Sequence, residues 1–264
     1  MAMSEAMPKV LVLGGNFAGL GAAQKIRDYA GDAVDITVVD RKAYLDYIPN
    51  IPLEIFEGRD PAVTMHMPLV GTLARDAITF MQAEVLGIDL AQRRVSMRPT
   101  ERPGAPEYRI GYDYLVIALG ARLAYDDIEG FAEHGFTVSD AFHANRLIDY
   151  LKHAYEGGPI AIGSDRFEQG RKGRPAWLPD ALAACEGPPV EVSLALAHWL
   201  EQNGKGGARN ITLFTPAALI AEDAGEKVVA QLLDAAGKMG LSYWNKTQGI
   251  ARLTGDAIEF RDGR

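Results

Sequence analysis

The chain has 264 residues, of which 48% are hydrophobic, and its 27 basic and 35 acidic side chains give a formal net charge of −8. This length can bury one large core or two modest ones. The acidic balance argues against nucleic acid as a partner, because it provides no broad attraction for phosphate backbones. No apolar run is long enough to span a bilayer, so we expect a cytoplasmic protein.

The first elements predict a nucleotide-binding unit. Val10–Leu13 is a short apolar run typical of a buried strand, residues 19–29 fit a helix that starts on small residues, and residues 35–40 fit a second strand. Strand, glycine turn, helix and strand in this order form the βαβ unit of a doubly wound sheet.

The turn in "VLVLGGNFAGLGAA" matches the fingerprint G-x-G-x-x-G at Gly14 and Gly19, with Asn16 in place of the middle glycine. Asparagine tolerates left-handed backbone geometry, so we expect Asn16 to complete the turn. Asp40 ends the second strand, where a carboxylate accepts hydrogen bonds from a ribose. The residues alone leave NAD and FAD open, and glycines can also serve only close helix–strand packing.

Further elements follow in chain order. The segment "YLDYIPNIPLEIFEG" is rich in proline and aromatic residues, so we expect an ordered loop with a short helix there. We expect strands in "ITFMQAEVLGID", in "RRVSMRP" and in "GYDYLVIALGAR", where the strand ends in Gly120. A helix over residues 141–155 closes this part of the chain.

A second βαβ unit follows. We expect strands in "GGPIAIGS", "NITLFTP" and "LSYWNK", alternating with helices in "PVEVSLALAHWLEQNG" and "AGEKVVAQLLDAAGKMG". The fold class is therefore α/β in three layers, with two Rossmann-like units: an FAD-binding domain over residues 1–155 and a second NAD(P)-binding-like domain over 156–264. In the terminal "AIEFRDGR", Asp262 and Gly263 are a hairpin-turn pair with no returning strand after them.

The second unit lacks the first unit's glycine turn, because no G-x-G-x-x-G follows Gly163. A nicotinamide site there is not expected. Cys185 is the single cysteine and lies just before a predicted helix, whose free N–H groups and positive dipole end favour thiolate over thiol. The alternative is a cysteine that acts only as a small packing residue.

"VLVLGGNFAGLGAA" and "YDYLVIALGA" together resemble the two FAD signatures of the pyridine nucleotide-disulfide oxidoreductase superfamily. That family commonly has Ala-Thr-Gly where this chain has Ala118, Leu119 and Gly120, so a hydroxyl is lost and the glycine is kept. The resemblance implies FAD as cofactor and the following binding residues: Gly14, Asn16, Phe17, Ala18, Gly19, Asp40, Arg41, Val85, Ala118 and Gly120.

The "ACEGPP" segment, followed by an apolar helix, is similar to sulfide:quinone oxidoreductases, and "DYIPNIP" is similar to their proline-containing segment. The resemblance implies sulfide and a quinone as substrates, Cys185 as the catalytic thiol, and possible oligomers. The family's second redox cysteine, last FAD motif and membrane-binding helices would lie after Arg264, so a C-terminally truncated fragment with peripheral membrane contact is expected.

Two alternatives remain open. One is a type II NADH dehydrogenase or another NAD(P)H-linked flavoprotein, and the other is a redox-inactive FAD-binding module. The five histidines have no ligand spacing with Cys185 or with one another, so we expect no metal.

Overall fold

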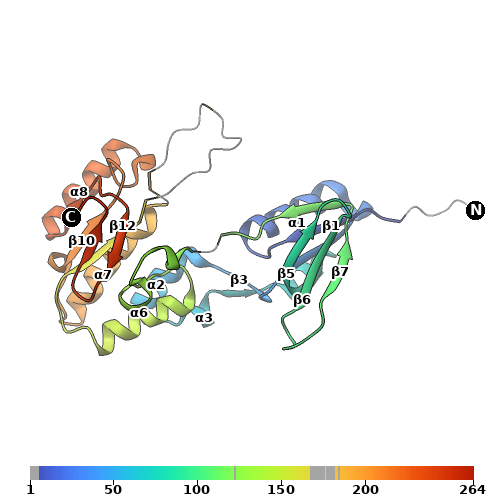
Figure 1. The fold of residues 1–264 in the computed structure, drawn as a ribbon, viewed down its shortest axis with the longest axis horizontal. Coiled ribbons are helices and arrows are strands. Elements are labelled where there is room, and N and C mark those ends of the chain that lie inside the picture. Colours follow the sequence, from blue (N-terminus) through green and yellow to red (C-terminus); the bar gives the residue numbers. More distant parts are fainter. Residues whose placement is uncertain (1–5, 122, 167–175, 177–181, 184) are drawn as a thin grey trace, which may run out of the picture. The chain divides into compact units, whose positions relative to one another are not determined.

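The computed structural model describes residues 6–121, 123–166, 176, 182–183 and 185–264. The chain folds into two compact units (Figure 1). The first comprises Met1–Tyr47 and Met65–Arg122, and the second comprises Ile48–Thr64 and Leu123–Arg264. The sequence-based division after residue 155 assigned domains by cofactor, and that assignment stays a prediction. The compact units divide elsewhere, because residues 48–64 pack with helices of the second unit.

A six-stranded mixed sheet forms the centre of the first unit, in the order β7-β6-β5-β2-β1-β8. Neighbouring strands pair in parallel from β8 through β1 and β2 to β5. From β5 through β6 to β7 the neighbours pair in antiparallel fashion. The strand bounds are β1 (Lys9–Leu13), β2 (Asp35–Asp40), β5 (Thr79–Asp89), β6 (Arg94–Pro99), β7 (Tyr108–Gly111) and β8 (Tyr114–Ile117). The expected β1–turn–helix–β2 unit is therefore present.

Helices and a small ribbon complete this unit. They are α1 (Phe17–Ala30), the 3-10 turn Gly31–Ala33, α4 (Val70–Arg75), β3 (Tyr44–Asp46) and β4 (His66–Pro68). Strands β3 and β4 pair in antiparallel fashion, from Tyr44 opposite Pro68 to Asp46 opposite His66. The expectation of a loop at residues 44–46 was therefore wrong, because the partner strand lies some twenty residues away in the sequence and leaves no local signal.

Strand β1 is buried on both faces, which explains its continuous apolar run. Val10 and Val12 pack on one face with residues of α1, β2 and α4, while Leu11 and Leu13 pack on the other with β2, β5 and β6. The carboxyl ends of β1 and β2 are held in register by this double burial, and the glycine turn starts there.

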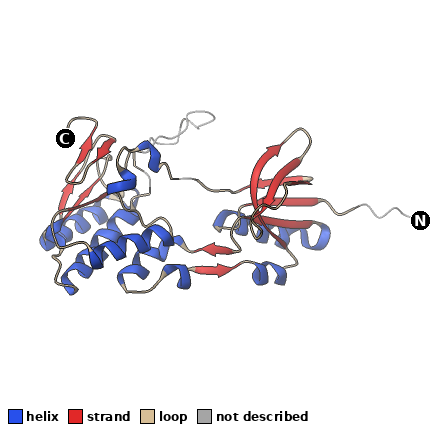
Figure 2. Cartoon of the chain, turned by 60° about the horizontal axis from the view of Figure 1, so that its bottom comes forward, coloured by secondary structure: helices blue, strands red, loops and turns tan. Residues whose placement is uncertain are grey.

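The second unit contains a parallel three-stranded sheet in the order β11-β10-β9. Its strands are β9 (Ile160–Gly163), β10 (Ile211–Phe214) and β11 (Ser242–Trp244). Its helices, which Figure 2 shows in blue, are α2 (Ile51–Phe56), α3 (Pro61–Thr64), α5 (Phe131–His134), α6 (Ala141–His153), α7 (Gly187–Gln202) and α8 (Glu226–Met239). Short 3-10 turns occupy Ile48–Asn50, Tyr125–Asp127, Ala208–Asn210 and Glu222–Ala224. The repeated strand–helix order confirms the α/β class with two Rossmann-like units.

A two-stranded antiparallel ribbon ends the chain, formed by β12 (Ile250–Leu253) and β13 (Ile258–Phe260). Strand β13 therefore pairs with the strand that precedes it, and the turn that joins β12 to β13 lies at Thr254–Ala257. Asp262 and Gly263 instead form a terminal turn in which Phe260 N–H donates to the Arg264 carbonyl at 2.8 Å.

Candidate functional site

The turn between β1 and α1 is closed by backbone contacts that only glycine allows. Gly14 has a φ of +108°, and a Cβ there would lie 2.1 Å from the carbonyl oxygen of Ala118. A Cβ at Gly19 would lie 1.8 Å from the carbonyl oxygen of Gly14. Both distances are far below van der Waals contact, so the packing of β1, α1 and β8 itself requires these glycines.

Asn16 begins α1 as its N-cap residue. Its backbone is extended, with φ −104° and ψ −166°, and its Oδ1 accepts a hydrogen bond from Phe17 N at 3.0 Å. Its Nδ2 donates to the carbonyl of Asp46 at 3.4 Å. The expectation of a left-handed Asn16 was therefore wrong. Asparagine suits this position because its side chain caps the helix, while Gly14 has the positive φ.

The Asp40 carboxylate lies at the carboxyl end of β2, beside the turn. Its Oδ2 accepts from Gly15 N at 2.7 Å, and its Oδ1 accepts from Lys42 N at 2.9 Å. A carboxylate has about four acceptor positions, so two backbone donors leave capacity for ribose hydroxyls. Asp40 is half-buried, so this capacity is reachable.

The start of α1 fits a diphosphate. Asn16 engages the N–H of Phe17, whereas the N–H groups of Ala18 and Gly19 belong to the first turn and have no acceptor within the helix. The side chains of Phe17 and Ala18 are exposed. Free donors at the positive end of a helix are what an anionic diphosphate requires, so the residues present fit a dinucleotide such as FAD.

The other predicted cofactor residues lie at the same end of the sheet. Ala118 directly follows β8, its N–H donates to Leu13 O at 2.7 Å, and Gly120 has a φ of +73°. Arg41 is exposed just past β2. Val85 lies in the part of β5 that continues beyond the register of Asp40, and its half-buried side chain packs against the apolar cluster of β1 and β6. Their contacts with a cofactor stay predictions.

A cluster of polar and charged side chains lies beside the turn, and no pattern in the sequence predicted it. Asp46 is 4% exposed, and its Oδ2 accepts from Lys42 Nζ at 2.9 Å. Its Oδ1 lies 3.4 Å from Nε2 of His66, whose ring stacks on Tyr44 with centroids 3.8 Å apart. Since the Asp46 carbonyl accepts from Asn16, this cluster helps to fix the turn. It became visible only when β3 paired with β4.

In the second unit, Cys185 is exposed and precedes Glu186, the N-cap residue of α7. Pro188 and Pro189 lie in the first turn and carry no N–H, so Gly187 supplies its free donor. The helix thus offers fewer donors to a thiolate than a generic N-terminus, and thiolate formation at Cys185 stays a prediction. Most of residues 164–186, where the sequence lacks a glycine turn, lie outside the described residues.

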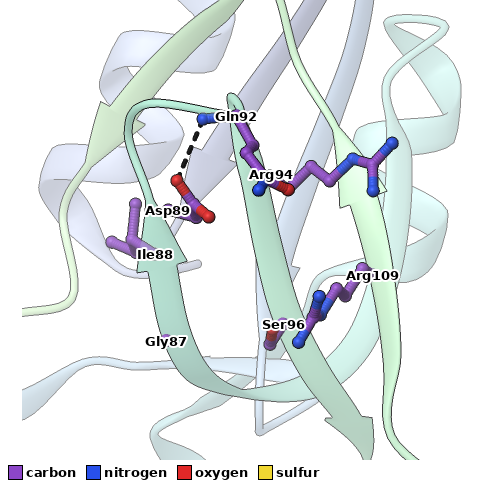
Figure 3. A pocket seen from close by; sticks show the side chains of 7 residues that line it. All are labelled: Gly87, Ile88, Asp89, Gln92, Arg94, Ser96 and Arg109. Carbon is purple, nitrogen blue, oxygen red and sulfur yellow. Dashed lines mark hydrogen bonds between the residues drawn. The ribbon is translucent and has the colours of Figure 1, made fainter.

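A shallow cavity of about 220 Å³ lies on the antiparallel part of the first unit's sheet (Figure 3). Arg94, Ser96 and Arg109 of β6 and β7 line it, together with Asp89 at the end of β5. None of the predicted cofactor residues borders this cavity, so it is distinct from the glycine turn.

The described residues contain neither a metal-binding cluster nor a membrane-spanning helix. No group of three or more histidine, cysteine, aspartate or glutamate side chains is placed to hold a metal ion within that part of the chain. Over the same residues, no helix combines the length and apolar character needed to cross a membrane.

Two Rossmann-like units, one with a glycine turn and an acid at the end of its second strand, are typical of dinucleotide-binding proteins. Residues 8–161 match the model of the family described as pyridine nucleotide-disulphide oxidoreductase. This match spans more than half of the chain, so the chain belongs to that family of flavin-dependent oxidoreductases.

Similar proteins include quinone-linked enzymes. The chain is 27% identical over 196 residues to the sulfide-quinone reductase of Aquifex aeolicus, covering 74% of this chain and 40% of the relative. It is 29% identical over 154 residues to a type II NADH:quinone oxidoreductase of Staphylococcus epidermidis, covering 58% of this chain and 36% of the relative. The chain thus spans about two fifths of the length of these relatives.

The fold also matches a solved structure. The sulfide:quinone oxidoreductase of Aquifex aeolicus superposes with a TM-score of 0.79 at 22% identity, covering 97% of this chain and 55% of that one. At this identity the likeness establishes the fold.

Proposed function

We propose that the first unit binds FAD and that the protein is a sulfide:quinone oxidoreductase-like enzyme. The observation that carries FAD is the Asp40 carboxylate next to the exposed start of α1, in a chain of this family. Gly14, Asn16, Phe17, Ala18 and Gly19 would hold the diphosphate, and Asp40 the ribose. Arg41, Val85, Ala118 and Gly120 would contact the rest of the cofactor.

Cys185 supports sulfide as the electron donor. It is the single cysteine of the chain, it is exposed, and it lies at the start of α7. Its thiolate would take up hydrosulfide as a persulfide, in which a sulfur–sulfur bond forms while one proton and two electrons leave. Bound FAD would supply the two-electron acceptor for this step, and a quinone would finally take up the two electrons with two protons as a quinol. The relative from Aquifex aeolicus is named for this substrate pair.

The same proposal places the protein in the cytoplasm, with peripheral contact to the membrane where quinones reside. The second candidate is NADH as donor, since a type II NADH:quinone oxidoreductase is similar at comparable identity. The absence of G-x-G-x-x-G after Gly163 in the sequence disfavours it.

Anaerobic absorbance spectroscopy tests the assignment. Purified protein reconstituted with FAD should show flavin bands that bleach with sulfide and stay with NADH. Bleaching by NADH alone would select the second candidate, and bands that neither donor bleaches would indicate a binding module. Protein that retains no FAD would exclude the cofactor assignment.

Cys185→Ser separates chemistry from binding, because serine keeps the size of the side chain but forms no persulfide. We expect an unchanged flavin content and sulfide bleaching slowed at least tenfold. A wild-type bleaching rate in this variant would remove Cys185 from the mechanism.

A further inference from the structure

A buried carboxylate lies beside the glycine turn without belonging to it. Asp46 is 4% exposed, and Lys42 Nζ donates a hydrogen bond to its Oδ2 at 2.9 Å. Its Oδ1 accepts no hydrogen bond from any residue that the structure describes and faces His66 Nε2 at 3.4 Å. Burying a charge whose hydrogen bonds are incomplete costs free energy, so a contribution to stability does not explain this carboxylate.

Two sets of contacts fix the place of Asp46 in the first unit. In the ribbon of β3 and β4 it lies opposite His66, whose ring stacks on Tyr44 with centroids 3.8 Å apart. Its carbonyl accepts a hydrogen bond from Asn16 Nδ2 at 3.4 Å, while Asn16 Oδ1 caps α1. The backbone of Asp46 is therefore tied to the start of α1, where the diphosphate is proposed to bind.

The side chain of Asp46 is joined to Asp40 through Lys42. The ammonium group of Lys42 pairs with Asp46, and the backbone N–H of Lys42 donates to Asp40 Oδ1 at 2.9 Å. Lys42 lies in the bend that follows β2, past the end of the ladder between β2 and β5. Anchoring its side chain therefore restrains the N–H group that orients Asp40. The second oxygen of Asp40 is held by Gly15 N at 2.7 Å.

We infer that Asp46 is a positioning residue for the FAD site: through Lys42 it holds the Asp40 carboxylate in the direction that a ribose requires. Because Asp46 is buried, it acts through Lys42 and not by contact with the cofactor. Polar groups that are oriented before a ligand arrives lose less freedom on binding, so this arrangement raises the affinity without an additional contact. Asp46 belongs neither to the glycine fingerprint nor to the expected cofactor residues, and this role rests on the proposed binding of FAD.

Flavin fluorescence titration of the apoproteins tests the role of Asp46. Asp46→Asn keeps the size of the side chain and removes its charge. We expect it to bind FAD at least about tenfold more weakly than the parent, because Asp40 loses its orientation. Asp28→Asn is the matched control, since it breaks the exposed Lys25–Asp28 pair near the far end of α1 and should leave the affinity unchanged.

A double-mutant cycle with Asp40→Ala separates positioning from a general weakening of the turn. The carboxylate that Lys42 orients is absent in the Asp40→Ala background, so adding Asp46→Asn should change the FAD affinity by less than about threefold. A further loss as large as the loss in the parent background would show that Asp46 acts on the fold of the turn, and would overturn the inference.

Variants of Lys42 test the link between the two carboxylates. Lys42→Arg keeps the cation, so its FAD affinity should stay within about threefold of that of the parent. Lys42→Met removes the cation and should weaken FAD binding as Asp46→Asn does. Parent-like affinity in Lys42→Met would exclude Lys42 as the connection and overturn the inference.

Melting curves recorded without FAD establish that each variant is folded. If Asp46→Asn does not fold, Asp46→Leu combined with Lys42→Met replaces it, because removing both charges leaves neither of them unpaired. Parent protein that binds no FAD would exclude the cofactor assignment and this role with it. Equal FAD affinities of the parent and a folded Asp46 variant would overturn this role alone.

Discussion

The Asp40 carboxylate is shared between the protein's own backbone and the proposed cofactor. Its two backbone donors, Gly15 N and Lys42 N, fix the side chain in the direction of the turn before any ligand is present. Asp35 lies at the opposite end of the same strand and is exposed. These two residues therefore form a matched pair for testing the ribose site.

We expect Asp40→Ala to weaken FAD binding more than tenfold relative to Asp35→Ala. A hydrogen bond to a charged acceptor contributes about 1.5–3 kcal/mol, which corresponds to this factor or more. Flavin fluorescence titration of the refolded apoproteins measures the two affinities. Equal affinities would exclude Asp40 as the ribose ligand, and melting curves without FAD separate binding from loss of the turn.

Gly14 does not permit the same kind of test. A valine there would bring its Cβ within 2.1 Å of the Ala118 carbonyl oxygen, in addition to the strain of a positive φ. We expect Gly14→Val to prevent the first unit from folding, so its missing flavin would say nothing about the diphosphate. Insoluble expression of this variant, against soluble Gly21→Ala in the open middle of α1, checks this expectation.

The stability of helix α1 depends on its N-cap residue, Asn16. Asn16 satisfies the N–H of Phe17, and glycine at an N-cap costs only a few tenths of a kcal/mol relative to asparagine. We therefore expect Asn16→Gly to leave FAD affinity within about threefold and to lower stability by less than about 1 kcal/mol. Asn16→Leu, which lacks any capping atom, should lose about 1 kcal/mol or more in urea unfolding. An equal loss in both variants would show that the cap contributes little.

The buried carboxylate of Glu54 in α2 pairs with Arg59, which follows the helix and is exposed, and the pH dependence of this ion pair is testable. Glu54 is 3% exposed, and Arg59 donates to its two carboxylate oxygens at 2.8 Å and 2.7 Å. These hydrogen bonds lower the pKa of Glu54 from 4.5 to about 2. Because the unfolded chain binds this proton more readily, the stabilisation is complete above pH 4.5 and is lost as the pH falls towards 2.

Glu54→Gln should therefore reduce the free energy of unfolding at pH 7 by roughly 1–2 kcal/mol, a modest value because Arg59 is partly exposed, and at pH 3 by about half of that or less. Urea unfolding at the two pH values measures this. Glu57→Gln is the control, because Glu57 also pairs with Arg59 but is exposed. A loss that is the same at pH 3 and pH 7 would contradict the assigned pKa.

Strand β8 forms one edge of the six-stranded sheet in the described part of the chain. Tyr114 and Ile117 of this strand are 62% and 58% exposed, and Leu119 just beyond it is 52% exposed. An apolar edge strand with free backbone groups is a site of intermolecular pairing. The chain by itself should consequently associate as its concentration rises.

Ile117→Lys should reduce this association, because a charge on an edge strand opposes pairing. Light scattering at concentrations on the order of 1 to 100 µM measures the association. The control is Leu90→Lys in the β5–β6 turn, because Leu90 is also exposed but lies away from the edge. Identical scattering from the two variants would exclude β8 as the contact.

Features that depend on neighbours along the chain can be predicted from residue types and their spacing. The apolar run of β1, the glycines of the turn and Asp40 at the end of β2 lie within about thirty residues of one another, and their order predicted the first βαβ unit. The alternation of strand and helix predicted the second unit in the same way. Residue type and spacing carry this information, because each element forms from local contacts.

Contacts between side chains that are distant in the sequence become visible only in the folded chain. Asp46 and His66 come together because β3 pairs with β4, and Glu186 reaches Thr215 because α7 packs against β10. The tertiary structure also corrected the role of Asn16, whose side chain caps α1 while Gly14 makes the positive-φ turn. Such contacts join residues 20 to 29 positions apart, and burial and hydrogen bonding across the folded chain, not local propensity, select them.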